Sequence, residues 1–193
     1  MVNIQIIEEL IPRSDKIFIS FGKVNYEDRF CLILETKKIF DVDFIIVKLI
    51  KSIPKWFKFL LNLRNAIAGI FGLKTGKIGN VYENLENLNL KQNQSIRDIF
   101  IFLKGKNHLI AELKDKHLDF RFSILIRQED GITKVSLSTI VKINNIFGKV
   151  YCFLIAPFHR LIIPNILKKI SGEKKFNQII LFQSTFNEVK SVL

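Results

Sequence analysis

The segment DKHLDFR, from Asp115 to Arg121, holds the side chains of this sequence that are best suited to chemistry. If the segment is a strand, its side chains alternate between two faces. The polar face would carry Asp115, His117, Asp119 and Arg121, and the apolar face would carry Leu118, Phe120 and Phe122. His117 and Asp119 could then bind a polar group or transfer a proton at the mouth of a cavity, because a carboxylate can orient an imidazole.

Two other interpretations of this segment stay open. In the first, the polar face meets solvent and its carboxylates pair with Arg121, as in antiparallel sheets that are covered on one side only. In the second, His117 and an aspartate bind a metal ion, which would need further ligands such as His108 or Glu112. No spacing here is diagnostic of a metal site, and we therefore expect neither a metal nor a cofactor.

Two further polar side chains lie beside apolar stripes. On a helical wheel His159 lies at the flank of an apolar stripe, where it either contacts a cavity or bonds to local backbone. Arg160 lies nearly opposite that stripe and is expected to be a surface or strand-anchoring group. Arg64 also lies at a flank, where it could bind an anionic head group or cover the stripe with its aliphatic stem.

Nucleophilic catalysis has little support in the sequence. No G-x-S-x-G motif occurs, and neither Cys31 nor Cys152 has metal-type or redox spacing. We expect both cysteines to be buried free thiols. We therefore assign no catalytic activity from the sequence.

The elements that must position these residues end in one long helix. From Thr139 an alternating strand runs through Asn144 and Asn145 directly into an apolar helix that is expected to bend at Pro157. At 100° per residue one apolar face of this helix consists of Phe147, Val150, Tyr151, Leu154, Phe158, Leu161 and Ile162. We expect this face to cover the sheet.

The rest of the chain predicts an α+β fold. A short element over 4–10 precedes extended segments over 18–24 and 29–36, and helices follow over 41–50 and after Pro54. The second of these helices has a stripe made of Trp56, Phe59, Leu60, Leu63, Ile67, Ile70 and Phe71. Period-two patterns over 99–103, 109–113, 117–127 and 135–143 predict antiparallel strands joined by short turns. Helices on one face of a curved antiparallel sheet are the expected architecture.

The length of 193 residues and the composition predict a single globular domain. Its formal net charge is +12, but the lysines are dispersed, and we expect no nucleic-acid partner. The N-terminal residues do not read as a signal peptide, and polar and proline residues interrupt the best apolar run, so we expect a cytoplasmic protein. The predicted domain covers 1–170, and 171–193 is expected to be a tail or an extra element.

Several motifs together resemble a known family. GLK at 72–74, DKHLDFR at 115–121 and the pattern T-V-NN-GK-Y-PFHR over 139–160, with Trp56 and LRN at 63–65, are similar to an uncharacterised bacterial family of domains of unknown function. That family is related to the START or polyketide-cyclase-like superfamily. The resemblance implies a helix-grip fold, in which a bent antiparallel sheet wraps around a long C-terminal helix, with two helices after the first strand. It also implies a cavity for lipids or other apolar molecules.

We therefore expect a cavity that binds an apolar or amphipathic small molecule. Its predicted lining residues are Trp56, Phe59, Leu63, Arg64, His117, Asp119, Phe120, Tyr151, Leu154, Phe158 and His159. One alternative is a cyclase-like or dehydratase-like enzyme that uses His117 or His159. The other is a peripheral membrane or interaction protein, with an anionic membrane or a second copy of the chain as partner. It would use Phe153, Ile163 and Leu167 beside basic residues of the final helix.

Overall fold

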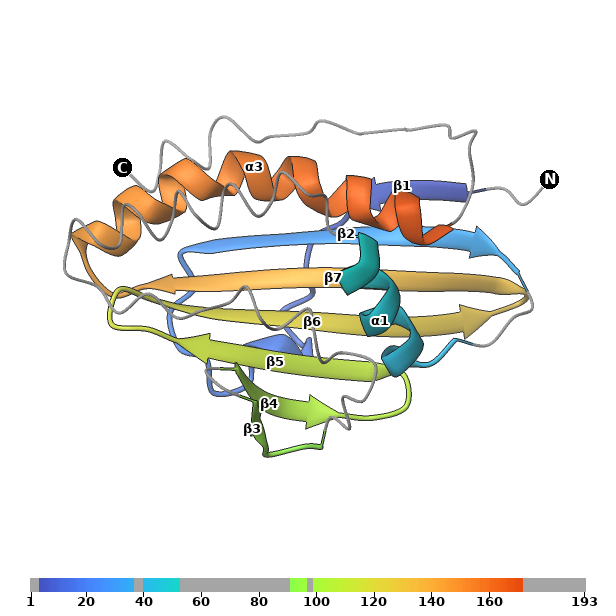
Figure 1. Ribbon diagram of the computed structural model, residues 1–193, viewed down its shortest axis with the longest axis horizontal. Coiled ribbons are helices and arrows are strands. Elements are labelled where there is room, and N and C mark those ends of the chain that lie inside the picture. The colour runs from blue at the N-terminus through green and yellow to red at the C-terminus, as the bar shows by residue number, and fades with distance from the viewer. Residues whose placement is uncertain (1–3, 37–39, 53–90, 97–98, 172–193) are drawn as a thin grey trace.

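A computed structural model describes residues 4–36, 40–52, 91–96 and 99–171 of the chain (Figure 1). Within these residues, seven antiparallel strands form one sheet in the order β1-β2-β7-β6-β5-β4-β3. The strands are β1 (Ile4–Glu8), β2 (Tyr26–Glu35), β3 (Ser95–Ile96), β4 (Ile99–Lys104), β5 (His108–Lys114), β6 (Leu118–Glu129) and β7 (Ile132–Ile143). The helices are η1 (Lys16–Phe18), α1 (Val42–Ser52) and α3 (Ile146–Ser171).

One face of the sheet, the inner face, packs against α1 and α3 (Figure 1). Since side chains alternate along a strand, every second residue of each strand points to this face. Phe30, Leu32 and Leu34 of β2 do so, and they share a buried core with Val42 and Leu167 of the two helices. Burying these side chains is worth roughly 1.5–3 kcal/mol each, which makes this core the main force that holds the helices on the sheet.

The opposite, outer face is polar but is not left to solvent. The Arg121 side chain is 1% exposed, donates to the Ile17 and Ile19 carbonyls at 2.9 and 2.5 Å, and pairs with Glu112 at 2.6 Å. Arg29 contacts Asp15 and Ser138 on the same face. A buried arginine needs such partners, and the result is that η1 and its flanking loop are tied across the outer face.

The start of α3 is joined to the turn between β5 and β6. The Asn145 side-chain oxygen accepts from the backbone N–H groups of Phe147 and Gly148, both at 3.1 Å, and from His117 Nδ1 at 2.9 Å. Asn145 is therefore the N-cap of α3. Its amide nitrogen donates to the Lys116 carbonyl at 3.1 Å, which fixes the identity of the accepting oxygen. The cap thus positions the helix and the turn together.

The α+β architecture with a long C-terminal helix is confirmed, and it has a helix-grip-like arrangement. The predicted strands over 99–143 correspond to β4 to β7, and the predicted helix at 41–50 corresponds to α1. The extended segment predicted over 18–24 is wrong. There η1 is followed by a turn in which Ser20 and Gly22 have positive φ angles of 56° and 85°. The second helix, predicted after Pro54, lies outside the described residues. Of the predicted tail at 171–193, Ser171 is the last residue of α3 and the rest lies outside the described residues.

The orientation predicted for α3 is wrong. The expected sheet-facing stripe is largely exposed, with Val150, Leu154, Phe158 and Leu161 at 52%, 45%, 42% and 60%. The buried side chains of the helix are Cys152, Ala156, Ile162, Pro164, Ile166 and Leu167, and of these only Ile162 belongs to the predicted stripe. The physical reason is that His159 and Arg160 of α3 bind Asp28 and Glu8 of the sheet. The face of the helix that packs on the sheet is therefore not its most apolar face.

Candidate functional site

Three polar side chains meet between the sheet and the middle of α3. The Tyr26 hydroxyl donates to Asp28 Oδ2 at 2.6 Å, and His159 Nδ1 lies 2.8 Å from the same oxygen. Tyr26 and Asp28 are two residues apart on β2 and therefore share the inner face, where His159 meets them from the helix. We call these three residues the polar triad.

Electrostatics keep the carboxyl of the triad ionised. Burial opposes ionisation of Asp28, but the nearby His159 and the hydrogen bonds from His159 and Tyr26 lower its pKa below the ordinary value. Burial and the Asp28 carboxylate together raise the pKa of Tyr26 well above its ordinary value. Tyr26 is therefore a neutral donor, and Asp28 accepts from both neighbours.

The carboxylate also fixes the orientation of the imidazole. An ionised Asp28 can only accept, so His159 Nδ1 must carry its proton. In a neutral ring Nε2 is then the acceptor, and the His159 side chain keeps 20% of its exposure while that of Asp28 keeps 1%. The site can therefore offer an oriented imidazole in a partly exposed side chain, and an oriented imidazole is a requirement both for binding a donor and for general base catalysis.

Neighbouring residues anchor the helix next to the triad. Arg160 donates to Glu8 of β1 at 2.5 Å, which agrees with the strand-anchoring role expected for it. Cys152 lies on the same face of the helix as Ala156 and His159. Burial and the charge of Asp28 raise the pKa of the Cys152 thiol to about 11. A thiol in this state is a poor nucleophile, so Cys152 packs rather than reacts.

Apolar rows run across the inner face from the triad. The register joins Asp28 to Thr139, Phe122, Ala111 and Ile101 on successive strands, and it joins Tyr26 to Val141, Phe120, Leu113 and Ile99. At about 4.8 Å between strands, each row spans roughly 19 Å. Phe120 and Phe122 are only half-buried and lie 6.1 Å apart. This part of the inner face is thus polar at one end and apolar along the rest.

The structure brings together only part of the predicted site. His159, Phe120 and the half-buried Tyr151 belong to the inner side of the molecule or its border. Leu154 and Phe158 lie on the exposed side of α3, as described above. Trp56, Phe59, Leu63 and Arg64 lie outside the described residues.

His117 and Asp119 are not partners. His117 precedes β6, is 8% exposed and bonds to Asn145, and its Nε2 has no hydrogen-bond partner within the described part of the chain. Asp119 points to the outer face, where it lies 3.6 Å from Lys142 and accepts from Asn144. The strand starts one residue after His117, so the alternation that grouped the two side chains does not apply.

Sequence reasoning missed Tyr26 and Asp28. The sequence does contain a signal for Asp28. Along β2, side chains of one face alternate as Tyr26, Asp28, Phe30, Leu32 and Leu34, so the carboxylate of Asp28 lies on the same face as the apolar core residues. A carboxylate on that face must find a partner, because an unpaired buried charge is very costly.

No cluster of three metal-type ligands occurs among the described residues. The sequence suggested His108 and Glu112 as further ligands of a metal site. Both have other partners on the outer face: His108 bonds to Ser123 at 2.9 Å, and Glu112 pairs with Arg121.

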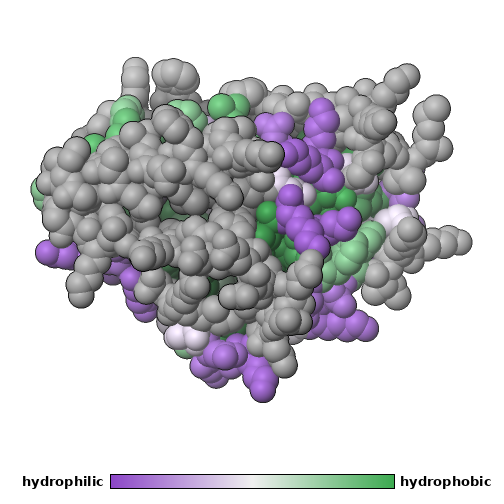
Figure 2. Space-filling view, viewed as in Figure 1, coloured by the Kyte–Doolittle hydropathy of each residue, from purple (hydrophilic) through white to green (hydrophobic). Residues whose placement is uncertain are grey.

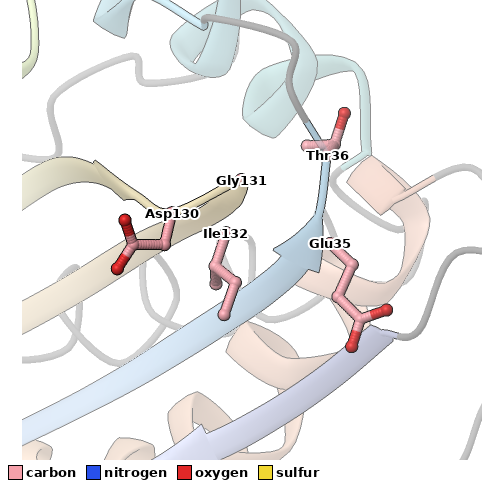
Figure 3. Close-up of a pocket in the computed structure, with 5 residues that line it drawn as sticks. All are labelled: Glu35, Thr36, Asp130, Gly131 and Ile132. Carbon is pink, nitrogen blue, oxygen red and sulfur yellow. The ribbon is translucent and has the colours of Figure 1, made fainter.

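An open surface pocket of about 440 Å³ lies elsewhere, at the far end of the sheet. Figure 3 shows its lining, which comes from the end of β2 and the turn between β6 and β7: Glu35, Thr36, Asp130, Gly131 and Ile132. Glu35 is seven residues from Asp28 along β2, or roughly 23 Å. Within the described part of the chain, none of the residues nominated for a ligand lines this pocket.

By length and composition, α3 could cross a membrane. An 18-residue window of the helix has a mean hydropathy of 1.5, and 33% of that window is buried. The same properties occur in core helices of soluble proteins. Here His159 and Arg160 bind the sheet from the middle of the helix, and Leu167 belongs to the core. These contacts describe a helix that lies on the sheet.

Comparison with known proteins identifies a family but no activity. No curated protein and no solved structure matches the chain. The family described as "Protein of unknown function (DUF2867)" matches residues 20–166, a range that contains the whole polar triad and both apolar rows. The chain therefore belongs to the DUF2867 family.

Proposed function

We propose that this protein binds an apolar or amphipathic small molecule on the inner face of its sheet, without catalysing a reaction on it. The observation that carries the proposal is the polar triad at one end of two apolar rows whose phenylalanines are only half-buried. Ligand sites of this kind combine an apolar wall with a few oriented polar groups.

The same observation indicates the head group of the ligand. Asp28 is ionised and buried, so a second anion beside it would be repelled. A hydroxyl group could instead donate to His159 Nε2, with the apolar part of the ligand along Phe122 and Phe120. The favoured ligand is therefore a molecule with a long apolar part and a neutral, hydrogen-bonding head group.

The fold supports a relation to the START or polyketide-cyclase-like superfamily, since an antiparallel sheet with a long C-terminal helix is the arrangement that the motifs predicted. The two free cysteines support a cytoplasmic location, where thiols stay reduced.

Native mass spectrometry of the purified full chain tests the proposal. We expect a bound molecule that organic solvent extracts, and we expect His159→Ala to lose it. His108→Ala is the matched control, because it removes an imidazole from the outer face. If the wild-type chain carries no molecule and takes up none from a lipid extract, the proposal is wrong.

A second candidate function is proton transfer on the bound molecule. The specific observation in its favour is the 2.8 Å contact between Asp28 and His159, which is the geometry of an oriented general base. Incubation of the extracted molecule with the protein in D₂O tests this candidate. Deuterium incorporation that is lost in His159→Ala would support it, and incorporation equal to that without protein would rule it out.

A further inference from the structure

The helix α3 has its polar and apolar faces reversed relative to an ordinary surface helix. Its polar residues His159 and Arg160 face the sheet, where they pair with Asp28 and Glu8. Its outer side carries large apolar residues instead, with Ile146, Val150 and Leu161 exposed by 63%, 52% and 60%. A surface helix usually has the opposite arrangement.

These outer residues form one continuous stripe. At 100° per residue, Ile146, Phe147, Val150, Phe153, Leu154, Pro157, Phe158 and Leu161 fall within an arc of about 140°. None of the eight side chains carries a charge, and over 146–161 no other residue lies in that arc. The stripe is roughly 22 Å long at 1.5 Å per residue. Figure 2 shows hydrophobic side chains along the upper edge of the molecule, over the first half of α3.

Basic residues lie at the end of the molecule where the stripe begins. The Asn145 side chain donates to the Lys116 carbonyl at 3.1 Å, which places the exposed Lys116 beside the first residue of the helix. Lys23 is exposed in the loop that Asn25 ties to the end of β7. The whole chain has a formal net charge of +12.

We propose that the outer stripe of α3 docks the protein on an anionic lipid bilayer surface, with the helix parallel to the membrane. A continuous exposed apolar surface of this kind marks an interaction site. The charge selects the partner, because a second copy of a chain that carries +12 is repelled while an anionic bilayer attracts it. The helix need not leave the sheet, since His159 lies on its other side and Arg160 lies outside the arc of the stripe.

Co-sedimentation of the full chain with vesicles tests this surface. We expect binding to vesicles of phosphatidylcholine with phosphatidylserine, weaker binding to phosphatidylcholine alone, and loss of the binding as salt increases. Val150→Glu should abolish binding, and Lys116→Glu should weaken it. Leu10→Glu is the matched control, because it adds the same charge at a position that is 88% exposed and lies outside α3.

Three outcomes would overturn the proposal. The first is wild-type protein that stays in the supernatant with every vesicle composition. The second is a dimer in solution that Val150→Glu dissociates, which would assign the stripe to a second copy. The third is a Val150→Glu variant that binds vesicles as the wild type does. A circular dichroism spectrum like that of the wild type checks that each variant is folded. Because His159→Ala leaves the stripe intact, its vesicle binding separates this surface from the ligand site.

Discussion

At the scale of single residues, Asp28 holds the site together. It is the common partner of Tyr26 and His159, and it links β2 to a helix residue that is 131 positions away in the sequence. The helical wheel correctly drew attention to His159, because its flank position is a local property. Its partner could not be predicted in the same way, since the pair depends on which strand lies beneath the middle of the helix.

The substitution Asp28→Asn tests this role. It removes the charge that pairs with His159 while the volume of the side chain is kept. Hydrogen bonds to a charged group typically contribute about 1.5–3 kcal/mol, and we expect a loss of unfolding free energy in this range when the Asp28 carboxylate becomes a neutral amide. Urea denaturation of the full chain measures it.

Asp119→Asn is the matched control for this experiment. Asp119 lies 3.6 Å from Lys142, whose side chain is 40% exposed, and exposed ion pairs contribute about 0–1 kcal/mol. Equal losses in the two variants would show that Asp28 has no special role.

At the scale of elements, the start of α3 is fixed by the close approach of Gly148 to the His117 carbonyl group. A side chain at Gly148 would place its Cβ 2.0 Å from the His117 carbonyl oxygen, so only glycine allows the helix to lie against the turn before β6. The Asn144-Asn145 sequence predicted the change from strand to helix, because asparagine is a favoured N-cap. The side on which the helix would pack could not be predicted, since the wheel assumes that the apolar face is the buried one.

Gly148→Ala should therefore destabilise the protein, although alanine is the better helix former. The helix propensity gain is about 1 kcal/mol, whereas overpacking against backbone typically costs about 1–3 kcal/mol, and the 2.0 Å approach lies at the severe end. Thermal unfolding followed by circular dichroism measures the difference.

Gly105→Ala provides the comparison. Its Cβ would meet the His108 carbonyl oxygen at 3.6 Å, which is an ordinary contact. A Gly148→Ala variant that melts as high as Gly105→Ala would contradict the proposed close approach.

At the scale of the whole molecule, buried carboxylates stabilise both faces of the sheet. Asp28 pairs with the helix on the inner face, while Asp15 and Glu112 pair with Arg29 and Arg121 on the outer face. Burial opposes the ionisation of all three, but hydrogen bonds and neighbouring cations lower the pKa of each below its ordinary value.

Acid should therefore unfold the protein in a defined direction. The three carboxyl groups have lower pKa values in the folded state, so the unfolded state binds more protons at acidic pH. The free energy of unfolding therefore rises with pH where these groups titrate. The stabilisation is complete above about pH 4.5 and is lost as the pH falls through the folded pKa values. Unfolding free energies measured between about pH 6 and pH 3 should decrease towards acid, and they should decrease less steeply in Asp28→Asn. A stability that is independent of pH in this range would contradict the assignment of these pairs.

The strand pattern and the final helix were predictable because alternation and helical spacing are local signals. The buried polar pairs were less predictable. The DKHLDFR alternation placed Arg121 correctly on the outer face, but its coverage by Ile17 and Ile19 depends on a loop 102 to 104 residues away. Sequence periodicity indicates which residues share a face, and long-range packing decides what covers that face.

A titration that follows the imidazole signals by nuclear magnetic resonance tests the central claim most directly. The chain has three histidines, so His108 and His117 are internal references for His159. We predict that 1-octanol shifts the His159 signals saturably and leaves those of His108 in place, and that octanoate, whose head group is anionic, shifts them less. Equal shifts of all three histidines, or no shift of His159 with either compound, would contradict a ligand site at the polar triad.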